Sequence, residues 1–143
     1  MTDLDPRTII IRIDLIHESL RILKEMLAKG RDAFETDPYV LAIAERHTQL
    51  AAQAALDIAD HIILAAGWKM AETYKDTFRV LGRHKVLDFD LSRRLEGLAG
   101  LRNILVHLYL EIDPDKFFDD LSSGLDDLEK FCNAVVRFLD SQT

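Results

Sequence analysis

The spacing of the apolar residues constrains the fold of this 143-residue sequence more than any other feature. In the first part of the chain, isoleucines and leucines recur at steps of three and four residues. These residues are Ile9, Ile13, Ile16, Leu20, Leu23 and Leu27. Such spacing places the side chains on one stripe of an α-helix, whereas a strand facing a core would alternate with a period of two. No strand-like alternating run occurs anywhere in the sequence, which predicts an all-α fold.

Prolines and glycines mark where the predicted helices begin and end. Asp5-Pro6 and Asp37-Pro38 each combine a capping residue with a proline suited to a first helical turn. Gly30 and Gly67 follow the first two apolar stripes and are expected to end them. The predicted helices cover about residues 6–29, 38–66, 71–81, 91–112 and 115–139, with a short polar connection at 31–37. We therefore expect a single domain over residues 1–143, a helical bundle of four to five main helices, two of them long and antiparallel.

Composition and charge narrow the class of protein. Apolar residues make up 48% and charged residues 30% of the chain, which is typical of a globular domain. Neither a signal peptide nor an apolar run long enough for a membrane span is visible, so we expect a cytoplasmic protein without membrane association. A net charge of −7 argues against a protein that coats nucleic acid. The basic residues that could attract phosphate concentrate between Arg79 and His107, where six oppose three acidic ones.

Cysteine and metal chemistry receive little support from the sequence. The single cysteine, Cys132, lies in a late helical stripe and is expected to be a buried structural thiol. Asp57 and His61 are one helical turn apart and, with Asp60, suggest a metal site. No third ligand follows at a recognisable spacing, so we expect a paired polar cluster and no metal. Asp57 could also line a cleft from across the bundle.

The candidate functional residues lie together between Leu98 and Tyr109, in the pattern Arg102-x-x-x-x-His107-x-Tyr109 with Asn103 beside the arginine. On a helical wheel these four residues fall on one side, within an arc of about 160°, and leucines and isoleucine occupy the opposite arc of about 100°. The apolar residues alone can therefore anchor the helix, which leaves the polar set free to face a cleft or a partner. Gly97 and Gly100, just before the motif, favour a kink or the close approach of another backbone.

The segment from Arg102 to Tyr109, Arg-Asn-Ile-Leu-Val-His-Leu-Tyr, resembles the signature of HEPN-domain proteins, and of the HepT-like toxins in particular. Leu56-Asp57-Ile58-Ala59-Asp60-His61 and Tyr74-x-x-x-Phe78-Arg79-x-Leu81-Gly82 agree with the same family, and the similarity extends from about Thr8 to Leu139. The resemblance implies a homodimeric helical bundle, or a higher homo-oligomer, with the motif at a cleft between subunits. It also implies a metal-independent ribonuclease toxin that needs no cofactor, with Arg102 and His107 as catalytic residues.

The same resemblance implies a partner, a nucleotidyltransferase-fold antitoxin that transfers AMP to the motif tyrosine, here Tyr109. The side chains suit RNA cleavage, because histidine exchanges protons near neutral pH and arginine holds phosphate oxygens. Asn103 is a supporting residue, four positions before His107, that could orient the histidine or the phosphate. The alternative function is a non-catalytic helical module that binds nucleotide or protein and docks onto the nucleotidyltransferase.

Overall fold

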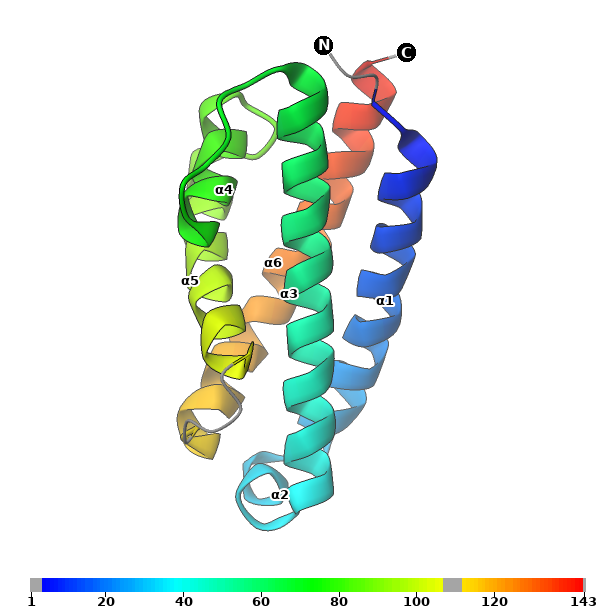
Figure 1. Cartoon of the computed structure of the whole chain (residues 1–143). Coiled ribbons are helices and arrows are strands. Elements are labelled where there is room, and N and C mark those ends of the chain that lie inside the picture. Colours follow the sequence, from blue (N-terminus) through cyan, green and yellow to red (C-terminus); the bar gives the residue numbers. More distant parts are fainter. Residues whose placement is uncertain (1–3, 107–111, 143) are drawn as a thin grey trace.

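Three long helices and three shorter ones form the bundle in the computed structural model of the chain (Figure 1). The structure describes the backbone of residues 4–106 and 112–142, and the side chains of the same ranges except 100–106. The helices are α1 (Pro6–Ala28), α2 (Arg31–Thr36), α3 (Pro38–Ala66), α4 (Tyr74–Arg83), α5 (Phe89–Val106) and α6 (Pro114–Ser141). Within these ranges there is no strand, which confirms the predicted all-α fold.

An aspartate followed by a proline starts each of the long helices. The carboxylates of Asp5, Asp37 and Asp113 accept hydrogen bonds from backbone N–H groups in the first turns of α1, α3 and α6. The proline behind each aspartate lacks an N–H that the first turn would leave unpaired, so its presence there costs nothing. At the other end of α3, Gly67 adopts the left-handed conformation, with φ of 75°, and its N–H bonds to the last turn.

The long helix α3 runs through the middle of the bundle, with α1 on one side, α4 and α5 on the other, and α6 behind (Figure 1). Late residues of α1 contact early residues of α3, as in the hydrogen bond between Ser19 and His47, so the two helices are antiparallel as predicted. Alanines fill the middle of α3 and are buried, which lets neighbouring helices approach closely. All six helices contribute to one hydrophobic core.

The structure corrects the prediction at one connection and at both ends of the third predicted helix. The segment expected as a polar connection forms the short helix α2, because Phe34 is buried against the rings of Phe117 and Phe118 at centroid distances of 5.9 and 5.1 Å. The third predicted helix starts three residues late, at Tyr74, where Thr73 provides the cap by accepting a hydrogen bond from the N–H of Asp76. It also passes through Gly82, which was expected to end it, and continues to Arg83.

Candidate functional site

The first residues of the predicted motif lie at the end of α5. Arg102 and Asn103 belong to the last turns of this helix, and their side chains fall outside the described part of the chain. His107 and Tyr109 also lie outside the described residues. The structure describes the bundle surface beside the turns of α5 that precede them.

The start of α5 is fixed firmly to the rest of the bundle. Leu91, Leu95 and Ala99 are buried and recur at four-residue intervals, so one face of the helix packs into the core. The carboxylate of Asp88 accepts a hydrogen bond of 2.7 Å from the N–H of Leu91 and caps the first turn. Ser92 is buried where α5 crosses Gly82 of α4. These contacts give the helix that carries the motif a rigid base.

A groove of about 1150 Å³ lies beside the turn of α5 that precedes the motif. It is bounded by α4, α5 and α6. Its lining residues are Lys75, Arg79, Arg94, Leu95, Glu96, Gly97, Leu98, Lys116, Asp120, Ser123, Gly124, Asp126, Asp127 and Lys130. A Cβ atom added at Gly97 or Gly124 would meet no other atom within 4 Å, so both glycines leave the groove open. This agrees with the expected room for a close approach at Gly97.

Ion pairs between helices shape the walls of this groove. The Nε atom of Arg79 on α4 donates to Glu96 on α5 at 3.0 Å, and that of Arg94 on α5 donates to Asp127 on α6 at 2.9 Å. The adjacent carboxylate raises the pKa of Arg94 further above its ordinary value, so the guanidinium stays charged. The two pairs tie α5 to its neighbours on both sides.

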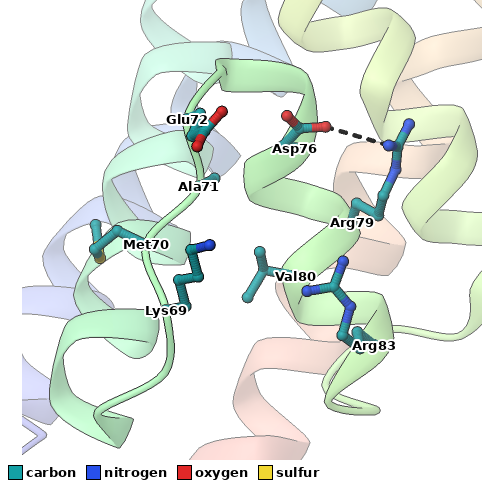
Figure 2. A pocket seen from close by; sticks show the side chains of 8 residues that line it. All are labelled: Lys69, Met70, Ala71, Glu72, Asp76, Arg79, Val80 and Arg83. Carbon is teal, nitrogen blue, oxygen red and sulfur yellow. Dashed lines mark ion pairs between the residues drawn. The ribbon is translucent and has the colours of Figure 1, made fainter.

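A second, smaller pocket of about 240 Å³ lies between α4 and the segment that connects α3 to it (Figure 2). Its lining residues are Lys69, Met70, Ala71, Glu72, Asp76, Arg79, Val80 and Arg83. Arg79 lines both this pocket and the groove, so the two lie next to each other on the surface of α4. The basic character of residues 79–85 was visible in the sequence, but the contribution of Lys69 was not, because it depends on how the connector folds.

The suspected metal cluster on α3 is a set of polar contacts directed toward α1. Asp57 lies 3.9 Å from the Arg12 guanidinium and accepts a hydrogen bond of 2.9 Å from Gln53. The Nε2 atom of His61 accepts a hydrogen bond of 3.2 Å from the backbone N–H of Asp5. Asp60 has a raised pKa, caused first by burial and then by the charge of Asp57. Among the side chains that the structure describes, those of residues 4–99 and 112–142, no group of three or more possible ligands could hold a metal ion.

Cys132 is a buried thiol, as the sequence indicated. It is 1% exposed, and burial, followed by the charge of Glu129, raises its pKa to about 12. A thiol with so high a pKa is almost entirely protonated at neutral pH and is a poor nucleophile. The cysteine is therefore part of the core and takes no part in a reactive site.

Among the helices of the described ranges, none is long and apolar enough to cross a membrane.

Two comparisons of the sequence with known proteins point to the same family. A family model described as "Ribonuclease HepT-like" matches residues 16–135. The chain is 32% identical to the tRNA nuclease HepT of Aphanizomenon flos-aquae over 139 residues, which cover 97% of this chain and 95% of that protein. It is 27% identical to the mRNA nuclease HepT of Shewanella oneidensis over 127 residues, which cover 89% and 95% of the two chains.

A solved structure agrees with these sequence matches. The tri-AMPylated HEPN toxin of Shewanella oneidensis, in complex with its MNT antitoxin, superposes on this fold with a TM-score of 0.83 and 26% sequence identity. The superposition covers 91% of this chain and 97% of that chain.

Proposed function

Because this chain belongs to the HepT-like ribonuclease family, we propose that it is an endoribonuclease and the toxin of a toxin–antitoxin pair. The observation that carries the proposal is the 32% identity to a tRNA nuclease over 97% of this chain. The HEPN resemblance noted in the sequence is thereby confirmed at the level of the family. The partner would be a nucleotidyltransferase-fold antitoxin, since a structural relative at 26% identity is described in complex with an MNT antitoxin.

The proposed reaction uses the RNA's own 2′-hydroxyl as the nucleophile. A base removes the proton of this hydroxyl, and the oxygen attacks the adjacent phosphorus. The bond to the 5′-oxygen breaks, and that oxygen takes up a proton, which leaves a cyclic phosphate. This chemistry needs no metal. His107 would exchange the protons, because histidine is the side chain best suited to gain and lose a proton near neutral pH.

Arg102 would hold the phosphate oxygens and stabilise the charge that develops on them in the transition state. Asn103 would orient the histidine or the phosphate as a positioning residue. A homodimer would bring two copies of these groups to one cleft. The open groove beside Gly97 supports such an arrangement, because it leaves room for a second helix one turn before the motif.

Replacement of the histidine tests the proposed catalytic role. We expect His107→Ala to abolish RNA cleavage and growth inhibition, while circular dichroism and oligomeric mass stay as in the wild type. Rates of RNA cleavage by the two purified proteins are the measurement. Equal cleavage by wild type and variant would show that His107 is not catalytic.

Tyr109 is the proposed site of inactivation. It lies seven residues after Arg102, so on a continuous helix the two would lie nearly in line. AMP on its hydroxyl would add negative charge and bulk next to the arginine and block the scissile phosphate. We expect the cognate antitoxin with ATP to add AMP to the wild type and not to Tyr109→Phe, as measured by intact mass. Neutralisation of toxicity with Tyr109 left unmodified would contradict this role.

The second candidate function is a non-catalytic module that binds nucleotide or protein and docks onto the nucleotidyltransferase. Its support is the acidic net charge of −7, which is unusual for a protein that must approach RNA. Tight binding to the partner, together with the absence of cleavage by highly purified protein on any RNA tested, would favour this function over the first.

A further inference from the structure

We propose that the small pocket between α4 and the preceding connector binds a phosphate group of the RNA strand, away from the cleavage motif. The inference rests on the proposed function, because it takes RNA as the ligand. The pocket encloses about 240 Å³, which suits a phosphate and part of a ribose better than a whole protein segment. Its walls combine three basic side chains and the carboxylates of Glu72 and Asp76 with the apolar surface of Met70, Ala71 and Val80 (Figure 2).

Two positive charges in this pocket have no carboxylate partner among the described residues. The side chains of Lys69 and Arg83 extend toward the same space, with Val80 between them (Figure 2). Neither forms an ion pair with any carboxylate of the described residues. Arg79 differs, because it pairs with Asp76 at 3.3 Å and with Glu96. In an acidic chain, two adjacent unpaired cations are a point of attraction for phosphate.

Both cations sit on backbone that is already ordered. Trp68, next to Lys69, stacks on His84, next to Arg83, with ring centroids 3.8 Å apart and an angle of 3° between the planes. The N–H of Trp68 bonds to the carbonyl of Ile63 at 3.1 Å, and the N–H of His84 bonds to the carbonyl of Val80 at 3.1 Å. The stack therefore fixes the connector against the end of α4. Little backbone order has to be gained when an anion binds.

The position of the pocket suits an RNA strand that reaches the motif. Gly82 contacts Ser92, so the pocket lies level with the start of α5. Ten residues separate Ser92 from Arg102, which is about 15 Å along a helix. Arg79 borders both the pocket and the groove that leads toward the motif. A strand could thus place one phosphate at the motif and another, a few nucleotides away, in this pocket.

A purely structural role for the two cations makes a different prediction. Lys69 follows the end of α3 and Arg83 ends α4, and positive charge stabilises the C-terminal end of a helix. The guanidinium of Arg83, however, lies beside Val80, one turn back from the end of its helix (Figure 2). A role at the helix ends alone would change the melting temperature and leave RNA binding as it is.

The test compares two pairs of substitutions that change the charge equally. In the His107→Ala background, which is expected to leave RNA intact, Lys69→Gln with Arg83→Gln removes the two pocket cations. Lys29→Gln with Arg46→Gln removes two exposed cations that do not line the pocket, one just after α1 and one in the first half of α3. Affinity for a labelled single-stranded RNA that is long enough to span both sites is measured by fluorescence anisotropy at several salt concentrations.

We expect the Lys69→Gln, Arg83→Gln protein to bind RNA about tenfold more weakly at low salt. The dependence of log affinity on log salt concentration should become shallower by about 0.7, the value for one lost phosphate contact on a single strand. The control pair should change the affinity less than twofold. With His107 intact, cleavage of a dinucleotide, which is too short to reach the pocket, should stay at the wild-type rate. Melting temperatures of all variants report any effect on folding.

Unchanged affinity in the pocket pair, or an equal loss in the control pair, would overturn the proposal. Competition by AMP or inorganic phosphate distinguishes the source of the phosphate. If either compound binds the pocket, but removal of Lys69 and Arg83 leaves the affinity for RNA unchanged, the pocket binds a free ligand. The proposal then fails. Failure of the proposed function is a separate result, namely a wild type that cleaves no RNA. In that case the binding measurement still decides the role of the pocket.

Discussion

At the scale of single residues, the contact between Gly82 and Ser92 limits how far apart α4 and α5 can lie where they cross. A Cβ atom at Gly82 would lie 2.5 Å from the Oγ atom of Ser92 and 2.8 Å from its Cβ atom. No rotation of the serine side chain moves its Cβ atom, so the two helices would have to separate. We expect Gly82→Ala to destabilise the protein by about 1–3 kcal/mol, as measured by urea denaturation.

The chain offers matched controls for this substitution. Gly97 and Gly124 also lie within helices, and a Cβ atom added at either would meet nothing within 4 Å. Alanine at those positions should stabilise the protein by roughly 0.5–1 kcal/mol, because it restricts the unfolded chain and favours the helix. A gain of stability in Gly82→Ala like that of the controls would show that α4 and α5 can move apart at no cost.

At the scale of elements, α3 combines a buried, alanine-rich side with a half-buried carboxylate. Burial and the nearby charge of Asp57 raise the pKa of Asp60 above its ordinary value of 3.8. Between the ordinary and the raised pKa, the folded protein binds more protons than the unfolded chain, so stability falls as pH rises through this range. Above it, the ionised Asp60 destabilises the fold by a constant amount.

We therefore expect Asp60→Asn to raise the melting temperature at pH 7, and the difference from wild type to disappear as the pH is lowered below about 3.8. Thermal melts across this pH range are the measurement. Asp14→Asn serves as the control, because Asp14 is exposed on α1 and should show no such pattern. A lower melting temperature for Asp60→Asn at pH 7 would mean that a positive charge stabilises the ionised carboxylate.

The sequence predicted elements well where an apolar stripe was long and poorly where tertiary contacts decided the structure. The stripes of α1, α3 and α6, together with the Asp-Pro starts of α1 and α3, led to nearly correct boundaries. The helix α2 was missed, because six residues with one buried phenylalanine are too short to show periodicity. The stack of Trp68 on His84 was also not predicted, because residues 16 positions apart reveal no pairing in sequence.

The sequence predicted which residues belong to the candidate site, but not how they are arranged in space. The motif could be found because Arg102, His107 and Tyr109 are close in sequence and resemble a family signature. The pocket at Lys69 and Arg83 could not be found in the sequence, because its two cations come from different segments that only the folded connector brings together. Asp57 illustrates the same limit, since its ion pair with Arg12 depends on how α1 packs against α3, which the sequence does not reveal.

At the scale of the whole molecule, the groove between α4, α5 and α6 is the place where the proposed dimer can be tested. Gly97 is exposed on the wall of this groove, in the turn before the motif, and its missing side chain leaves the space open. If a second subunit approaches there, a large side chain at this position would hold the subunits apart. The fold of the single chain would tolerate it, because a Cβ atom at Gly97 meets no neighbour within 4 Å.

We expect Gly97→Trp to shift the protein from a dimer toward the mass of the single 16.3 kDa chain in light scattering, with a melting temperature close to that of the wild type. RNA cleavage should fall at least tenfold, since each cleft would lose the groups of the other subunit. Ala42→Trp, which adds the same bulk on an exposed turn of α3 outside the groove, should leave mass and cleavage unchanged. A Gly97→Trp protein that stays dimeric and active would place the subunit contact on another face of the bundle.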